Sequence, residues 1–336
     1  MQNRFFLWLY SYTNPVQLDF ENLPPDLPAT DLQYFVRILQ HLDKLLPDAG
    51  MTFVLTWHLD AFHEVMKDAV ILLVGDEQYQ TPSYQRRVRA IFKTGGVTPN
   101  LLRDTLRLPW PIAWRAILRD ARNHGTRIKR RWRHGSGGRV KTLMGELPLG
   151  YFQLREADPI PVDLRPVDVF FAGVKAVSGW TLRASVAARK QMAAGLTAAQ
   201  AALPDYRIES LLTALASGQR LDPEAYTRAL ANTKIALAPR GNFDETFRLF
   251  EAAKLGCVIV SDPLPQRWYY QGSPVVSIPK WSVLPGVLKG LLADPANLAE
   301  LSRRTRQWWD STLSEAAVAN HIAKRLKNAD RLDPRE

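Results

Sequence analysis

Short apolar runs, separated by segments with helical periodicity, constrain the fold of this chain more than any other feature of its sequence. Residues 52–57 and 69–74 are apolar without polar–apolar alternation, which is typical of strands buried on both faces of a sheet. A further strand is predicted at residues 4–11, and helices are predicted at residues 35–42 and 84–92. Strands that alternate with helices predict βαβ units and a parallel sheet.

The same alternation returns after a proline-rich stretch, which we take as the boundary between two domains. Residues 154–167 hold three prolines among charged residues. Beyond them the pattern predicts strands at residues 167–171, 234–239, 257–261 and 275–278, and helices at residues 180–194, 246–255 and 297–327. The predicted fold is α/β, with Rossmann-like domains over residues 1–155 and 165–310 and a C-terminal helix and tail over residues 311–336.

The chain carries an excess of positive charge. It has 336 residues, with 44 Lys and Arg against 33 Asp and Glu, a formal net charge of +11 and a pI near 9.8. This excess favours acidic partners: phosphorylated substrates, an anionic membrane surface or nucleic acid. The single cysteine, Cys257, excludes an intrachain disulfide and favours a reducing compartment. No apolar run approaches the roughly 18 residues of a spanning helix, so we expect a cytoplasmic protein, soluble or peripheral at the inner membrane face.

The stretch from residue 226 to residue 262 has the features of a phosphate-binding unit in a parallel sheet. An apolar strand ends at Pro239-Arg240-Gly241, and an acidic turn and a helix follow. Ligands bind outside the carboxyl ends of parallel strands, where the N-terminus of the next helix attracts phosphate. Arg248 and Glu251 share one face of this helix, and they fit a diphosphate and ribose hydroxyls. The alternative is an ordinary ion pair on the helix surface.

Three motifs follow one another in this stretch. They are Pro239-Arg240-Gly241, Arg248-Leu249-Phe250-Glu251-Ala252 and Gly256-Cys257-Val258-Ile259-Val260. Together they resemble the signature of the exostosin-like glycosyltransferases. Tyr226 also fits the helix that precedes this signature in the family, whereas Ile259 departs from it, because proline is common at that place.

The resemblance implies the GT-B fold, in which two Rossmann-like domains face each other and the C-terminal one holds a nucleotide-sugar. It also implies transfer of the sugar with inversion, without a bound metal or another cofactor, and UDP is the expected nucleotide. The donor-binding positions carried over are Arg240 and Arg248 toward the diphosphate, Glu251 toward the ribose, and Gly241 and Asn242 in the turn between them. The sequence agrees on the metal, since it has no Asp-x-Asp motif and its six histidines do not cluster.

The turn after the first strand of the C-terminal domain is a second candidate contact for phosphate. Gly173 lies in this turn, and glycine lets the backbone approach a ligand closely. The family shows a similar Phe-x-Gly element followed by an arginine, which here is Arg183. An ordinary loop with a solvated Arg183 fits the sequence equally well, because a single glycine-containing turn is not specific.

In the N-terminal domain, an apolar strand delivers two carboxylates, Asp76 and Glu77, at its carboxyl end. Microbial exostosin-like proteins have a similar Leu-Gly-Asp-Glu element, followed at a distance by an aromatic and a basic residue, here Phe92-Lys93. Inverting transfer needs a general base that accepts the proton of the acceptor hydroxyl, and either carboxylate is a candidate. His58 and Asp60, at another strand end, are rivals. In the simplest alternative Asp76 caps the next segment and Glu77 is solvated.

An Arg-rich segment runs from residue 115 to residue 141 and ends in glycines, which predict a loop. Seven Lys or Arg lie between Arg127 and Lys141, with Trp132 among them. The segment resembles no nucleic-acid-binding module, so nucleic acid is not the expected partner. An anionic membrane surface or an anionic acceptor, such as a lipid-linked diphosphate or an acidic polysaccharide, fits better. A solvated loop without a specific role is the simplest interpretation.

The residues and the resemblance together predict a glycosyltransferase. It would move a sugar from a nucleotide-sugar to a glycan or lipid-linked acceptor, in the synthesis of a bacterial-type surface polysaccharide. The alternative is a non-catalytic protein of the same fold that binds anionic glycan or nucleic acid through residues 115–141. Salt-dependent binding of polyanions without turnover of a nucleotide-sugar would favour this alternative.

Overall fold

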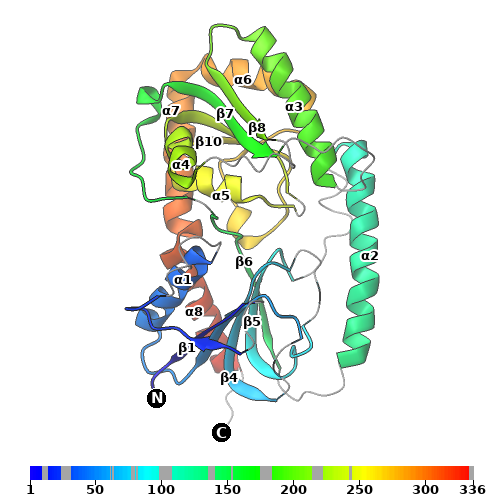
Figure 1. Cartoon of the computed structure of the whole chain (residues 1–336), viewed down its shortest axis with the longest axis vertical. Helices are drawn as coiled ribbons and strands as arrows, with labels where there is room; N and C mark the ends of the chain where they lie inside the picture. Colours follow the sequence, from blue (N-terminus) through cyan, green and yellow to red (C-terminus); the bar gives the residue numbers. More distant parts are fainter. Residues whose placement is uncertain are drawn as a thin grey trace. The chain divides into compact units, whose positions relative to one another are not determined.

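The computed structural model describes most of the chain. The described residues are 1–9, 14–23, 32–60, 62, 64–76, 80, 82–97, 108–134, 141–152, 154–174, 184–213, 222–241 and 244–332. They form two compact units, each built from separate stretches of the chain and each with its own sheet (Figure 1). The first unit comprises Met1–Pro99, Asp120–Gly150 and Ser314–Glu336, and the second comprises Asn100–Arg119 and Tyr151–Leu313.

The first unit contains a six-stranded sheet with the order β2-β1-β3-β4-β5-β6. Its strands are β1 (Arg4–Trp8), β2 (Val16–Gln17), β3 (Thr52–Thr56), β4 (Met66–Leu73), β5 (Val88–Thr94) and β6 (Leu143–Leu147). The edge strand β2 is antiparallel to β1, and the other neighbours are parallel. Every residue of β3 is buried, which explains why this strand lacks polar–apolar alternation.

Two helices of the first unit, α1 (Gln33–Leu45) and α8 (Glu315–Leu332), pack against each other. The helical periodicity predicted over residues 35–42 is confirmed, because Phe35, Ile38, Leu39 and Leu42 are all buried on α1. The buried side chains of α8 are Val318, Ala319, Ile322, Ala323 and Leu326. The end of the chain therefore completes the core of the unit in which the chain begins.

The helix predicted at residues 84–92 is wrong. Val88–Thr94 forms β5, a strand that lies between β4 and β6. Neighbouring residues of β5, such as Ile91 and Phe92, point to opposite faces of the sheet and are both fully buried. Burial of both faces removes the two-residue periodicity that distinguishes a strand from a buried helix.

The Arg-rich segment is a helix, not a loop, as far as His134. Helix α2 spans Trp110–His134 without interruption (Figure 1). Residues 135–140, with the glycines, lie outside the described part of the chain. Ile112, Ala113 and Ala116 bury one face of the first turns, and Arg and Lys are good helix formers. The charge density of the segment concealed this helical periodicity.

The second unit contains a five-stranded parallel sheet with the order β11-β10-β9-β7-β8. Its strands are β7 (Val167–Val174), β8 (Ile208–Thr213), β9 (Thr233–Ala238), β10 (Val258–Ser261) and β11 (Val276–Ser277). Its helices are α3 (Ala184–Ala202), α4 (Pro223–Ala231), α5 (Phe247–Lys254), α6 (Leu284–Leu292) and α7 (Pro295–Trp308). Strand β8 was not predicted from the sequence, because this edge strand is only partly buried.

The direction of strand addition reverses at β7. Strand β8 follows β7 in the chain and lies on one side of it, whereas β9 lies on the other side. The carboxyl ends of β7 and β9 therefore flank a topological switch point, which is where open α/β sheets bind ligands.

Residues 297–327, predicted to be helical, comprise most of α7, one π-helical turn at Trp309–Leu313 and part of α8. Trp308 and Trp309 are both buried, as expected of anchoring side chains. In the described part of the chain, no helix combines the length and the apolar character that crossing a bilayer requires. The predicted fold class, two α/β domains on parallel sheets with C-terminal helices, is confirmed.

Candidate functional site

The switch point of the second sheet brings two predicted site residues into contact. The Nε of Arg248, on α5, donates a hydrogen bond to the carbonyl oxygen of Ala172 at the end of β7. Its guanidinium lies over the ring of Phe171, with the guanidinium carbon 5.2 Å from the ring centroid. A Cβ atom at Gly173 would lie only 2.6 Å from Nη2 of Arg248. Glycine at this position therefore leaves the space that the arginine head occupies.

The turn after β9 holds two more predicted residues, Arg240 and Gly241. The main-chain N–H of Arg240 donates to Oδ2 of Asp262 at 2.8 Å, and its guanidinium pairs with Asp244. The N–H of Gly241 donates to the carbonyl oxygen of Glu245 at 3.2 Å. Arg240 is nearly fully buried, and its Nε has no hydrogen-bond partner among the described residues. A buried donor without an acceptor is costly, so an incoming acceptor atom would satisfy it.

Asp262, which follows β10, fixes the position of this turn. Its Oδ2 accepts from Arg240, and its Oδ1 accepts from Nε1 of Trp281 at 2.9 Å. Burial raises the pKa of this carboxyl, while the N–H and the charge of Arg240 oppose the increase. The sequence contains Asp262 within the family-like stretch, but no pattern there indicates that it binds the backbone of Arg240.

Glu251, predicted to contact a ribose, is buried and has protein partners on both carboxylate oxygens. Its Oε2 accepts from the hydroxyl of Tyr226 at 2.7 Å, and its Oε1 accepts from the N–H of Phe152 at 3.1 Å. Burial and the charge of Glu251 raise the pKa of Tyr226 well above its usual value, so its hydroxyl is a stable donor. A ribose hydroxyl would have to share these oxygens or displace one partner, and the role of Glu251 toward the ribose stays a prediction.

A buried network behind the turn was missed by the sequence analysis. Oε1 of Glu245 accepts from the hydroxyls of Tyr269 at 2.6 Å and Tyr270 at 2.9 Å, and it lies 2.8 Å from Nη1 of Arg267. All four side chains are buried. Burial raises the pKa of Glu245, and Arg267 and the two hydroxyls counteract this. The only signal in the sequence was the aromatic run Trp268–Tyr270, which follows β10.

Arg189, on α3, is a further residue that the sequence analysis missed. Its Nε is buried and has no hydrogen-bond partner among the described residues. Burial, and then the positive charge of Arg248, lower the pKa of Arg189 to about 10. Within the described part of the chain, neither arginine pairs with a carboxylate. Two like charges in this arrangement repel each other until an anion binds between or beside them.

Three predicted site residues cannot be placed. Glu77, Arg183 and Asn242 lie outside the described residues. Their assignments as a candidate base and as two donor contacts stay predictions.

Asp76 lies at the carboxyl end of β4 in the first unit, where it forms a buried ion pair. Its Oδ2 is 2.5 Å from Nζ of Lys93, and the two side chains are 3% and 1% exposed. The same oxygen accepts from the N–H of Gln80 at 2.8 Å. The sequence predicted an accessible base at this position. Instead, the carboxylate of Asp76 already binds the ammonium group of Lys93 and has little contact with solvent. A catalytic role for Asp76 stays a prediction and requires this ion pair to loosen.

The rival strand end after β3 also has protein partners. Oδ1 of Asp60 lies 2.5 Å from Nη2 of Arg130, and this carboxylate is 59% exposed. The Nε2 of His58 lies 3.1 Å from the carbonyl oxygen of Leu9. Asp60 is therefore more accessible than Asp76, although its partner is a cation as well.

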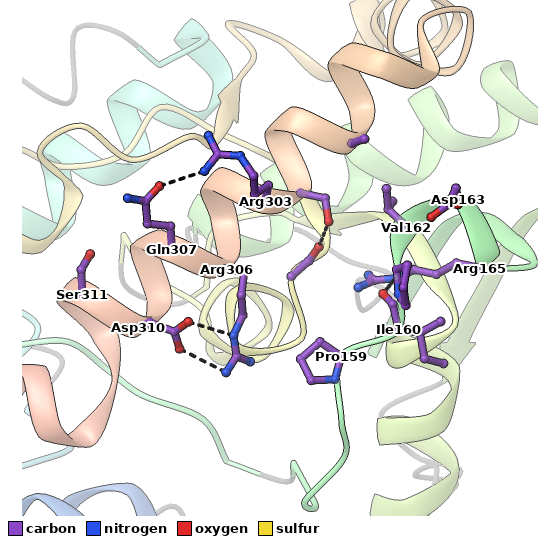
Figure 2. Close-up of a pocket in the computed structure, with 14 residues that line it drawn as sticks. Pro159, Ile160, Val162, Asp163, Arg165, Arg303, Arg306, Gln307, Asp310 and Ser311 are labelled. Carbon is purple, nitrogen blue, oxygen red and sulfur yellow. Dashed lines mark hydrogen bonds and ion pairs between the residues drawn. The ribbon is translucent and has the colours of Figure 1, made fainter.

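A pocket of about 810 Å³ is lined by Arg165 and Gly256, which precede β7 and β10, so it lies at the amino ends of these strands. Figure 2 shows the side chains that line it. Its cations already have partners. Arg306 pairs with Asp310 at 3.1 Å, and Arg303 pairs with Glu300 at 2.8 Å. Arg165 donates to the carbonyl oxygens of Ile160, Thr233 and Leu255. This pocket lacks the uncompensated cations found at the switch point, so it is the weaker candidate for a phosphate site.

Among the described residues, no group of three or more His, Cys, Asp or Glu side chains could hold a metal ion. Arg248, Arg189 and Arg240 are three described cations at or near the switch point. Arginine side chains bind phosphate and carboxylate groups directly through paired hydrogen bonds, so this cluster of arginines suits an anionic ligand.

Comparisons with known proteins find similarity at the level of structure, and no protein-family model and no curated protein matches the chain. One similar structure is the pneumococcal O-GlcNAc transferase GtfA in complex with UDP and GlcNAc, with 10% identity over 88% of this chain and 60% of that chain and a TM-score of 0.43. Another is the glycosyltransferase SnogD from Streptomyces nogalater, with 15% identity over 96% of this chain and 99% of that chain and a TM-score of 0.41. A third is T4 phage BGT in complex with its UDP-glucose substrate, with 8% identity over 98% of this chain and 99% of that chain and a TM-score of 0.40. This protein thus covers 60% of the length of the GtfA chain. It also covers 60% of the matching chain in the crystal structure of the GtfA/B complex.

Proposed function

We propose that this protein is an inverting, metal-independent glycosyltransferase that uses a nucleotide-sugar, most simply a UDP-sugar. The observation that carries the proposal is the contact of Arg248 with Gly173 and Ala172 at the switch point. Arg189 lies near enough for Arg248 to lower its pKa, and neither cation has a carboxylate partner within the described residues. A diphosphate is the common anion that matches two such guanidinium groups, since each can donate two parallel hydrogen bonds.

Gly173 and the N-terminus of α5 also favour a diphosphate as the ligand. Gly173 leaves room for the guanidinium of Arg248 at the end of β7, where this cation would meet a phosphate. Thr246 begins α5 and makes no capping hydrogen bond with its own side chain. The N–H groups of the first turn of α5 point along the helix axis toward the switch point, and they add partial positive charge there.

In the proposed reaction, the oxygen of an acceptor hydroxyl attacks the anomeric carbon from the face opposite the diphosphate. The bond between this carbon and the phosphate oxygen breaks, its electron pair leaves with the nucleotide diphosphate, and the configuration inverts. Arg248 and Arg189 would stabilise the negative charge that develops on the leaving group. The acceptor proton passes to a carboxylate base, for which Asp76 and Glu77 are the candidates.

The acceptor that we propose is a glycan or lipid-linked hydroxyl, as in the synthesis of a surface polysaccharide. The family resemblance supports this class, and so does the overall positive charge of the chain, since such acceptors often carry phosphate or carboxylate. The identity of the transferred sugar depends on the shape of the donor pocket.

The donor site is tested by thermal stabilisation of the protein by UDP, GDP and CMP, with and without EDTA. A ligand that binds only the folded state raises its melting temperature. We expect a shift with one nucleotide, UDP first, that persists in EDTA. Arg248→Gln removes one guanidinium, and we expect it to weaken nucleotide binding by about tenfold or more, the value of a charge-assisted hydrogen bond.

The matched control is Arg303→Gln, which removes an exposed arginine at the opposite edge of the same sheet. It should bind the nucleotide as the wild type does. Equal stabilisation of wild type and Arg248→Gln would contradict the donor site, and loss of the shift in EDTA would contradict metal independence. Release of nucleotide diphosphate from the matching nucleotide-sugar, in the presence of acceptor, then tests the transfer itself.

A further inference from the structure

Helix α2 has an exposed apolar face. Residues three and four apart lie on one face of a helix, and Leu118, Ala121, Gly125, Ile128 and Trp132 follow this spacing. All five are exposed. Trp132 is 84% exposed and Ile128 is 46% exposed, and Leu118, in the first half of the helix, is 53% exposed. Single exposed apolar side chains are ordinary, but a stripe of them along one helix indicates an interaction surface.

Cations flank this apolar stripe. From residue 121 to residue 134 the sequence has six Lys or Arg and no Asp or Glu. Arg122 and Lys129, seven residues apart, lie beside the stripe and are exposed. Neither forms an ion pair with a described residue. The positive charge of this face is therefore not neutralised by the described part of the protein.

The opposite side of α2 is engaged by the protein itself. Asp120 and Asn123 are buried, and Arg130 pairs with Asp60 at 2.5 Å and donates to the carbonyl oxygen of Leu59. A partner that needs access to the whole circumference of the helix, such as a groove that wraps it, could not bind without pulling α2 away. A partner that presents a broad surface to one face of the helix requires no such change.

We infer that the Arg122–Lys129 and Ile128–Trp132 face of α2 binds an anionic membrane surface. Tryptophan and aliphatic side chains gain from insertion at the boundary between headgroups and acyl chains, and the adjacent cations gain from anionic headgroups. Nucleic acid would satisfy the cations, and an unpaired base would stack on Trp132, but it would offer no comparable apolar environment for the aliphatic Ile128. The inference goes beyond sugar transfer and does not require it, although it would explain how a lipid-linked acceptor reaches the enzyme.

The experiment is flotation of the full-length protein with phosphatidylcholine vesicles that contain or lack phosphatidylglycerol. We expect the wild type to float with the anionic vesicles, to remain unbound with phosphatidylcholine alone, and to dissociate at high salt, because electrostatic attraction at a membrane is screened by ions. No nucleotide or acceptor is added. A negative flotation result would therefore not contradict the proposed donor site, and absence of nucleotide binding would not contradict membrane binding.

Two double variants separate the two components of the face. Arg122→Gln with Lys129→Gln should lower the partition coefficient by about 30-fold, since each cation near an anionic surface contributes about fivefold. Ile128→Ser with Trp132→Ser should lower it by about tenfold or more through loss of apolar insertion, while its salt dependence remains. All four side chains are exposed, so both variants should keep the melting temperature of the wild type.

The control is Val65→Ser with Lys67→Gln, which makes the same kinds of change at an exposed part of the first unit near the start of β4. It should bind vesicles as the wild type does.

Failure of the wild type to bind anionic vesicles would overturn the inference, as would equal binding by all three double variants. Tighter binding to a nucleic-acid oligonucleotide than to the vesicles, with loss in the cation variant and none in the Ile128→Ser, Trp132→Ser variant, would assign the face to nucleic acid instead.

Discussion

Arg189 and Arg248 are like charges that come from different helices, α3 and α5, and that share one neighbourhood. In the described structure the repulsion between them is not offset by a carboxylate, and the Nε of Arg189 is buried without a hydrogen bond. The charge of Arg248 therefore adds to burial in disfavouring the protonated form of Arg189. Negative charge supplied by a ligand would favour both guanidinium groups.

Loss of the Arg189 guanidinium should affect nucleotide binding and leave the stability of the fold intact. We expect Arg189→Gln to weaken nucleotide binding by about tenfold, because one charge-assisted contact is lost. Its melting temperature without nucleotide should be no lower than that of the wild type, because a repulsive pair is removed. Calorimetric titration and thermal unfolding measure the two quantities. Lys190→Gln, at the exposed neighbouring position, is the control and should change neither. A variant that unfolds earlier and binds nucleotide normally would show that Arg189 is a structural residue.

The turn between β9 and α5 is the element that carries the candidate site, and buried side chains set its shape. Asp262 holds the N–H of Arg240, while Glu245 is held by Tyr269, Tyr270 and Arg267. Each of these partners follows β10 in the chain. The conformation of the turn therefore depends on the neighbouring strand and its loop as much as on the Pro-Arg-Gly motif itself.

Tyr269→Phe tests this dependence through pH. The change removes a hydrogen bond to the Glu245 carboxylate, so the pKa of Glu245, already raised by burial, rises further in the folded state. The folded state then binds more protons than the unfolded state, and stability falls as pH rises above the unfolded value near 4.5. We expect a loss of about 1–2 kcal/mol in the free energy of unfolding near pH 7 that shrinks at about pH 4.

The measurement is denaturant unfolding at both pH values. Tyr84→Phe is the control, because its hydroxyl donates to the neutral carbonyl of His58 at 2.9 Å. Its loss of stability should be the same at both pH values. A pH-independent loss for Tyr269→Phe as well would contradict the ionised state of Glu245 on which the expectation rests.

At the scale of the whole molecule, neither unit is a continuous stretch of chain. The first unit takes its last helix, α8, from the C-terminus, and α8 packs on α1 near the N-terminus. Val318, Ile322 and Leu326 are fully buried there. Their burial contributes roughly 5–9 kcal/mol, which is comparable to the total stability of a domain.

A chain that ends at Leu313 should therefore lose the fold of its first unit. We expect amide hydrogens of α1 and β3 to lose their protection from exchange, while those of β7 and β9 keep it, because the second sheet receives no strand from the deleted part. A chain that ends at Leu332 is the control and should exchange like the full chain. Protection of α1 in the shorter chain would show that the first unit folds without α8.

What the sequence determined by itself is local. The buried strands β3 and β4, the amphipathic α1 and the spacing of Arg240, Arg248 and Glu251 could all be predicted, because periodicity and short motifs report burial and helix faces within one segment. The two parallel sheets followed from the alternation of such segments. The tertiary structure decided the pairs, which are Asp76 with Lys93 and Glu251 with Tyr226. It also brought Arg189 within the electrostatic influence of Arg248. It also decided that residues 88–94 form a strand, because β5 lies between two strands that bury both of its faces. These outcomes depend on which segments become neighbours in a sheet, and that is set by contacts between distant residues that no local pattern encodes.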